Sequence, residues 1–242
     1  MERNQQDWLA GLKRHGLKPI ILSPEEREAK EKAESIKYTA MYEKQRRERY
    51  MANSSFPDSI DKAFTFRDWD PSKQKDVDKA KQIARMSLDM ARELKESNYN
   101  VLFFGNAGAG KTSLAIAMMN ELAATKTTMF VSMIEWLAMK YQSFSDERVA
   151  NQVYGLEQMM KDVDVLVLDD LGKDSQREAK ETAAKMLFQV ANARTEKTTI
   201  ITTNDNPKEL GDKYDMATVS RLVPKNAAHI ISTNGLQDVR EV

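Results

Sequence analysis

The sequence predicts an α/β protein in which helices cover a parallel sheet, preceded by a small helical N-terminal region. Three observations predict this architecture. From about residue 100 onward, short apolar runs of strand length alternate with helical stretches, which is typical of a parallel sheet with both faces covered. The first 52 residues differ from the rest because charged side chains make up more than half of residues 23–50. The length of 242 residues accommodates one α/β domain and a small appendage.

The N-terminal region carries the signals of a long exposed helix. Ser23 is a candidate N-cap, a proline follows it, and Glu26 completes a capping box. Residues 23–50 hold seven acidic and eight basic side chains, several of them paired at i,i+4. A narrow apolar seam runs along one face, formed by Ala29, Ala33, Ile36 and Ala40. Two interpretations remain open: a solvated helix resting on its own domain, or a helix that binds a partner.

Bulk composition excludes several classes of function. The 37 basic and 37 acidic side chains balance, so any contact with nucleic acid has to come from a local patch. The absence of cysteine excludes disulfides, thiolate zinc sites and cysteine nucleophiles, and it suits a reducing compartment. The N-terminus lacks the apolar run of a secretory signal, and the apolar stretches are too short to span a bilayer. We therefore expect a soluble cytoplasmic protein without a membrane partner.

A linker is expected between the two regions. Residues 53–58 (Asn-Ser-Ser-Phe-Pro-Asp) have turn chemistry, so the sequence predicts a helical region 1–52, a linker 53–63 and an α/β domain 64–242. Phe64, Phe66 and Trp69 follow the linker. Three aromatic residues so close together can stack on nucleic-acid bases, but they more often anchor a linker to the edge of a domain, and we favour the anchor.

The strongest signal is a phosphate-binding loop. A buried-type strand at 101–104 runs into a glycine-rich segment that is followed by an apolar helix, the setting that this motif requires. Glycines allow the backbone N–H groups to surround phosphate oxygens, and the helix dipole attracts the anion. Lys111 is expected to reach the β- and γ-phosphates of ATP, and the Thr112 hydroxyl to ligate Mg²⁺. The expected ATP-binding residues are Gly105, Asn106, Ala107, Gly108, Ala109, Gly110, Lys111, Thr112 and Ser113.

Two further strands end in polar side chains. Residues 164–170 read Asp-Val-Leu-Val-Leu-Asp-Asp, so Asp169 ends a strand where the Mg²⁺ shell is expected. Asp170 would lie beside the γ-phosphate and act as the general base for the attacking water. A third strand, 198–203, ends at Asn204, whose amide could hold this water in line. The alternative for Asn204 is a helix cap or turn, which would be preferred if the other two motifs were missing.

From about residue 64 onward, the chain resembles the AAA+ ATPases, and more narrowly the bacterial and phage helicase loaders of the DnaC/DnaI type. The resemblance rests on VLFFGNAGAGKTSLAIAMMNEL, VLVLDDLGKD, ANARTEKTTIITTN and VSRL, in that order. It implies that Asn204 is sensor 1, that Arg221 is an arginine finger acting on a neighbouring subunit's ATP, and that Arg240 is sensor 2. Asp170 stands where most AAA+ members have glutamate, which implies slow hydrolysis.

The same resemblance implies partners. In loaders of this type the N-terminal region, here residues 1–52, grips the replicative hexameric helicase. The AAA+ domains associate with one another on single-stranded DNA, and Lys140, Tyr141 and Phe144 fall where relatives present DNA-facing residues. An aromatic beside a cation suits base stacking, although the end of a helix packed on its own domain is an equally good interpretation.

Three other functions remain open. An IstB-type transposition helper would also bind ATP and DNA but would partner a transposase. A small-molecule kinase would need an arginine-rich lid and an acceptor pocket, and residues 174–185 offer neither clearly. A nucleotide switch or scaffold without hydrolysis would be favoured if Asp170 is catalytically idle.

Overall fold

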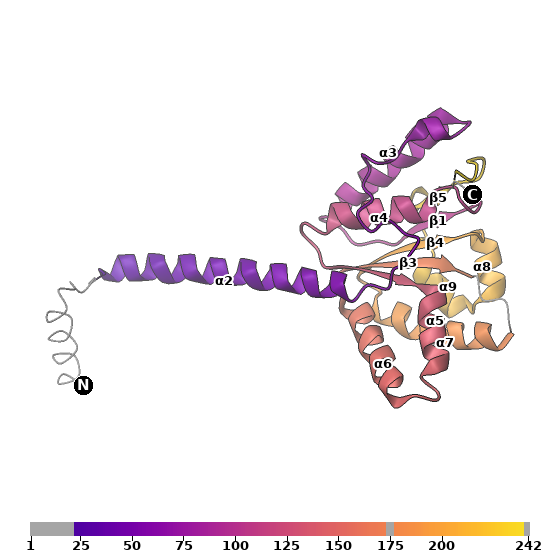
Figure 1. Ribbon diagram of the computed structural model, residues 1–242. Coiled ribbons are helices and arrows are strands. Elements are labelled where there is room, and N and C mark those ends of the chain that lie inside the picture. Colours follow the sequence, from indigo (N-terminus) through magenta and orange to yellow (C-terminus); the bar gives the residue numbers. More distant parts are fainter. Residues whose placement is uncertain (1–21, 173–176, 240–242) are drawn as a thin grey trace. The chain divides into compact units, whose positions relative to one another are not determined.

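A computed structural model of the chain describes residues 22–172 and 177–239. Among these residues, five parallel strands form one sheet in the order β2-β3-β4-β1-β5 (Figure 1). The strands are β1 (Val101–Phe104), β2 (Thr128–Ser132), β3 (Val165–Leu171), β4 (Thr198–Thr203) and β5 (Ile230–Ser232). The parallel sheet, its flanking helices and the glycine-rich loop after β1 confirm the predicted P-loop fold of AAA+ type.

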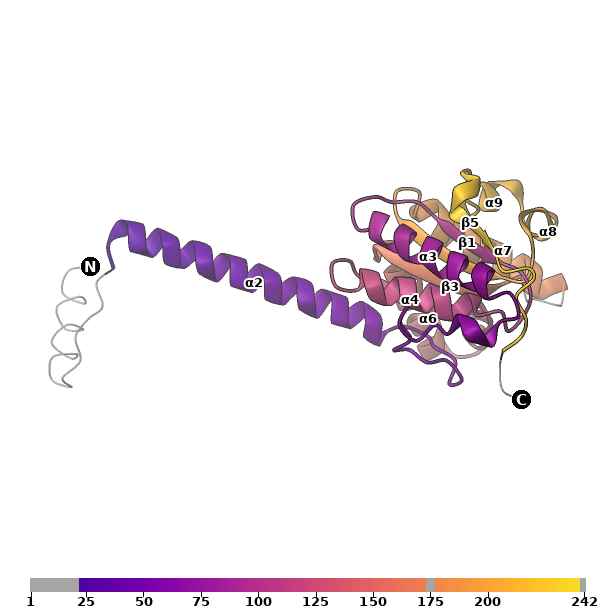
Figure 2. The same ribbon diagram turned by 90° about the horizontal axis from the view of Figure 1, so that it is seen from above.

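Helices cover the two faces of this sheet (Figures 1 and 2). Strand side chains alternate between the faces: Val101 and Phe103 of β1 pack with one set of helices, and Leu102 packs with the other. The first set is α3 (Val77–Glu93) and α4 (Lys111–Leu122). The second set is α5 (Met133–Gln142), α6 (Glu147–Asp162), α7 (Arg177–Ala193), α8 (Pro207–Lys213) and α9 (Met216–Leu222). Two short 3₁₀ turns complete the described elements, η1 (Pro71–Lys73) and η2 (Ala227–His229).

Helix α2 (Pro24–Ala52) begins at the predicted capping box. Ser23 Oγ accepts from the Glu26 amide at 3.2 Å, and the Glu26 carboxylate accepts from the Ser23 amide at 2.7 Å. The chain divides into two compact units, Met1–Gln45 and Arg46–Val242, so the boundary falls within α2. This boundary lies before the predicted linker.

The position of the boundary follows from contacts that begin in the last turns of α2. Tyr50 is buried and its hydroxyl donates to Asp162 at the end of α6, which lowers the pKa of that carboxyl. Residues 54–56 then continue along the edge of β2: the Ser55 amide donates to the Phe130 carbonyl at 2.8 Å, and the Phe56 ring stacks on the Phe130 ring at 4.5 Å. The predicted linker therefore starts as part of the sheet's edge.

The three aromatic residues after the linker anchor this segment to the domain, as favoured from the sequence. Phe64, Phe66 and Trp69 are partly buried against the core beneath α3 and α4. Trp69 Nε1 donates to the Ala80 carbonyl of α3 at 3.2 Å. In the part of the chain that the structure describes, no helix combines the length and apolarity needed to cross a bilayer.

Arg194 ties the amino ends of the strands together. This residue is 3 % exposed, and its guanidinium donates to the carbonyls of Met160, Val163 and Thr198 at 2.6, 2.7 and 2.5 Å. These carbonyls belong to α6, to its C-cap and to the first residue of β4. Burial lowers the pKa of Arg194 to about 9. The donated hydrogen bonds compensate for placing a cation in the core.

Candidate nucleotide-binding site

The phosphate loop, residues 105–112, lies at the carboxyl edge of the sheet. β1 leads directly into it, and α4 begins inside it at Lys111. Gly110 is the N-cap of α4 with φ 82°, a backbone conformation that favours glycine. A β-carbon on Gly110 would also clash with the Trp69 ring, so this position has no room for a side chain. A glycine-rich loop at a helix N-terminus is suited to binding an anion.

Lys111 connects the loop to the neighbouring strand. Its side chain is buried, and Nζ donates to the carbonyls of Gly105 and Asn106 at 2.9 and 2.7 Å. It also donates to Asn204 Oδ1 at 2.9 Å. Because β4 pairs directly with β1, the residue that follows β4 lies beside the phosphate loop. The structure thus brings together the predicted phosphate-binding lysine and the predicted sensor amide.

Thr112 and Asp169 meet as the predicted magnesium site requires. Thr112 Oγ1 donates to Asp169 Oδ1 at 2.7 Å, and the carboxyl is 2 % exposed. The Thr202 hydroxyl donates to the same oxygen at 2.6 Å and fixes its orientation. A hydroxyl beside a carboxylate fits Mg²⁺, which protein sites bind through one or two oxygen ligands together with nucleotide phosphates. Thr202 was missed from the sequence because its partner lies on another strand.

Asp170 has an unusual backbone. Its φ is 60°, the left-handed region that non-glycine residues adopt at a cost of roughly 1–3 kcal/mol. Its N–H donates to Thr202 Oγ1 at 3.0 Å, and the β3–β4 register is irregular between Leu168 and Leu171. At this bulge the regular alternation of side chains between the two faces of the sheet is interrupted at Asp169 and Asp170. The half-buried Asp170 therefore lies next to the Thr112–Asp169 pair.

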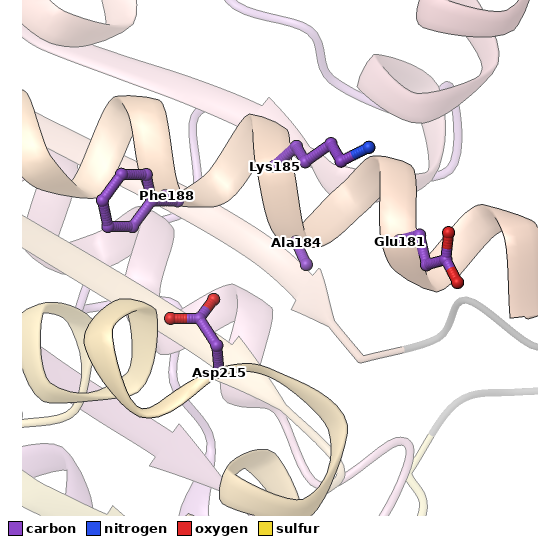
Figure 3. A pocket seen from close by; sticks show the side chains of 5 residues that line it. All are labelled: Glu181, Ala184, Lys185, Phe188 and Asp215. Carbon is purple, nitrogen blue, oxygen red and sulfur yellow. The ribbon is translucent and has the colours of Figure 1, made fainter.

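Arg221 lies away from these residues, at the opposite edge of the sheet. Asn100, just before β1, donates its side-chain amide to the Arg221 carbonyl at 2.6 Å, whereas the phosphate loop follows the end of β1. The Arg221 guanidinium bonds to Asn192 Oδ1 at 3.1 Å and lies over the Phe188 ring at 5.4 Å. Phe188 also lines a surface hollow between α7 and the start of α9, together with Glu181, Ala184, Lys185 and Asp215 (Figure 3).

The three residues expected to face DNA lie at the end of α5 and just beyond it. Lys140 is 3.8 Å from the Glu157 carboxylate of α6, so its charge is partly engaged within the domain. The Tyr141 and Phe144 rings make an edge contact at 6.0 Å and stay 40 % and 69 % exposed. The aromatic pair is accessible for stacking, while the cation packs on its own domain.

Comparisons with known proteins agree with this geometry. The model of a family described as IstB-like ATP binding protein matches residues 34–235. The chain belongs to this family. No match was found among curated protein sequences.

Solved structures share the fold of this chain at low sequence identity. A crystal structure of DnaI has a TM-score of 0.57 at 20 % identity, covering 76 % of this chain and 96 % of that one. A DNA replication initiation factor has a TM-score of 0.56 at 20 % identity, covering 72 % and 50 %. DnaA bound to AMPPCP and single-stranded DNA has a TM-score of 0.55 at 20 % identity, covering 72 % and 51 %. The IstB-like chain thus spans about half the length of the replication initiation proteins that it matches.

Arg240, the expected sensor 2, lies outside the described residues. The preceding residue, Val239, donates its N–H to the Gly108 carbonyl at 3.3 Å.

On α2, Ile36 of the predicted seam is 63 % exposed, and Tyr38 and Tyr42 are each 64 % exposed. At about 100° per residue, Tyr38 lies roughly 160° and Tyr42 roughly 120° around the helix from Ile36, so the two tyrosines lie off the predicted seam. The sequence predicted one apolar stripe on this helix, and the exposed Tyr38 and Tyr42 add a second apolar surface.

Proposed function

We propose that the protein is an ATP-hydrolysing loader that binds the replicative DNA helicase and places it on single-stranded DNA during replication initiation. The observation that carries the ATPase part is the convergence of Lys111, Thr112, Asp169 and Asn204 at one edge of the sheet. Membership in a family of ATP-binding proteins supports the nucleotide. The size of the domain supports the assignment as a loader, because the match to this chain covers 96 % of the DnaI structure.

The proposed reaction is hydrolysis of ATP to ADP and phosphate. The loop N–H groups and Lys111 hold the phosphates, and moving Lys111 from the Gly105 and Asn106 carbonyls to the phosphates replaces neutral acceptors with charged ones. Thr112 and Asp169 would hold Mg²⁺, which offsets the negative charge of the phosphates. A water oxygen attacks the terminal phosphorus while the bond to the ADP oxygen breaks. Asp170 takes the proton of this water, and the Asn204 amide orients it.

Self-association completes the proposed site. The Arg221 backbone is held at the amino end of β1 while its own phosphate loop follows the carboxyl end, so we assign this arginine to the ATP of another subunit. An arginine supplied in trans stabilises charge that develops on the transferred phosphoryl group. Hydrolysis by a lone subunit is then slow, and assembly on the helicase or on DNA accelerates it.

DNA and helicase are assigned to separate surfaces. Tyr141 and Phe144 offer exposed rings on which bases can stack, and a structural relative, DnaA, is bound to single-stranded DNA. The helicase is assigned to residues 1–52, because the exposed Ile36, Tyr38 and Tyr42 of α2 are large apolar side chains that a partner could bury.

A binding experiment with purified helicase tests the loader. The full chain, residues 1–52, and a truncated protein starting at Arg46, where the compact unit begins, are each immobilised. We expect the full chain and residues 1–52 to capture the helicase, and the truncated protein to bind only ATP. Ile36→Asp in the full chain should weaken capture, whereas Ser35→Asp, which adds the same charge beside the seam, should not. Capture by the truncated protein alone would rule out this assignment.

A transposition helper is the second candidate, because the family model that matches residues 34–235 is described as IstB-like ATP binding protein; this match does not favour the helper over the loader. It shares the proposed ATP chemistry but replaces the helicase with a transposase. Capture of a transposase by residues 1–52, with no capture of helicase, would select this function.

A further inference from the structure

The phosphate loop is covered on one side by the segment Asn234–Val239, here called the C-terminal strap. The Val239 amide bonds to the Gly108 carbonyl, and the Asp238 carboxylate occupies the space that a β-carbon on Gly108 would need. Just before the strap, the Thr233 amide donates to the Phe104 carbonyl at 2.8 Å, at the entrance of the loop. An acidic side chain of this protein therefore lies directly against the loop that is built to bind an anion.

Several contacts hold the strap in this position. Gln74 is 4 % exposed and pairs with the backbone of Gln237 in both directions: Nε2 donates to the carbonyl at 3.1 Å, and Oε1 accepts from the amide at 2.8 Å. Leu236 is buried in the core beneath α3, and the Lys79 ammonium donates to the Asn234 carbonyl. A backbone fixed by a buried amide and a buried leucine gives the carboxylate of Asp238 a defined place.

We propose that Asp238 sets the nucleotide affinity of this site, with the strap acting as an intramolecular brake on the binding of the polyphosphate. The inference rests on the proposed ATP site. A triphosphate carries several negative charges into a loop that already faces a fixed carboxylate, and like charges this close repel each other. Binding then requires the strap to shift or the repulsion to be overcome. A charged Asp238 therefore lowers the affinity for ATP more than the affinity for ADP, and lowers the affinity for AMP least.

The opposite role is also chemically possible, because a carboxylate beside a phosphate loop can accept hydrogen bonds from ribose hydroxyls. The two roles make opposite predictions. A brake binds ATP more tightly when the carboxylate becomes an amide, whereas a ribose contact is weakened by the same change. The position of the carboxylate against the Gly108 backbone, within the phosphate loop itself, favours the brake.

The test is calorimetric titration of the full chain with ATP, ADP and AMP. Asp238→Asn should bind ATP about tenfold more tightly than the wild type at low salt, with a smaller gain for ADP and almost none for AMP, and the gain should shrink as salt is added. Asp212→Asn removes the same charge from the exposed surface of α8 and should leave all three affinities unchanged.

A second variant tests the strap itself. Gln74→Leu removes both bonds to Gln237, so amide hydrogen exchange of residues 234–239 should accelerate and ATP affinity should rise severalfold. Faster exchange with unchanged affinity, or equal or weaker ATP binding by Asp238→Asn, would overturn the brake while leaving the nucleotide site intact. Failure of every variant and of the wild type to bind ATP would instead refute the proposed function, and the brake with it.

Discussion

Replacing Arg221 with alanine should abolish hydrolysis while the subunit's own phosphate site stays intact. The side chain is anchored by Asn192 and Phe188, and its carbonyl is bonded to Asn100 at the amino end of β1. The phosphate loop begins where β1 ends, and the four residues of this strand span about 13 Å at about 3.3 Å per residue. The arginine therefore cannot contribute to ATP bound in its own subunit, and ATP affinity should not change.

The loss of rate should be large, and it should be rescued by mixing. An arginine finger contributes about 10³–10⁵ in rate, so Arg221→Ala alone should be almost inactive. Asp170→Asn alone should also be nearly inactive, since it lacks the base but keeps the finger. In an equimolar mixture, about one quarter of head-to-tail neighbour pairs combine an intact site with an intact finger. Phosphate release from the mixture should therefore recover to about one quarter of the wild-type rate.

Co-assembly is the necessary control for this mixture. Differently tagged variants are purified together to show that they share complexes, and the rate is measured on the same material. If the complexes contain both variants and the rate equals the sum of the two single rates, Arg221 does not act across a subunit boundary. A wild-type rate for Arg221→Ala alone would remove the residue from the mechanism entirely.

Two further variants separate chemistry from stability. Asp170→Asn should bind ATP with wild-type affinity and hydrolyse it at least about 100-fold more slowly, because it removes the base but keeps the Thr112–Asp169 pair. ATP titration and phosphate release measure both quantities, and a wild-type rate would favour the switch without hydrolysis. Arg194→Met should lower the free energy of unfolding by about 3 kcal/mol, since buried carbonyls lose their donor while the cost of the buried charge is relieved. Urea denaturation measures this loss, Arg92→Met on the exposed face of α3 is the control, and equal losses in the two variants would contradict the role of Arg194.

Features that depend on neighbouring residues could be predicted from the sequence. The strand, the glycine-rich loop and the helix are contiguous in the sequence, so the loop glycines and Lys111 can be recognised without knowing the tertiary structure. The capping box at Ser23 and the alternation of apolar strands with helices are local in the same sense. The sequence predicted Asp169 and Asn204 at strand ends; Asn204 follows β4, whereas Asp169 lies two residues before the end of β3, and both lie at the carboxyl edge because the strands are parallel.

Contacts between residues far apart in the chain could not be predicted from the sequence. Thr202 orients Asp169 because β4 lies beside β3, and Asp238 reaches Gly108 because β5 lies beside β1. The order of strands in the sheet produces these pairings, and no local pattern encodes that order. The same holds for Arg194, whose partners lie on α6, after α6 and on β4. A long-range contact has no sequence period, so it becomes visible only when packing has brought the two segments together.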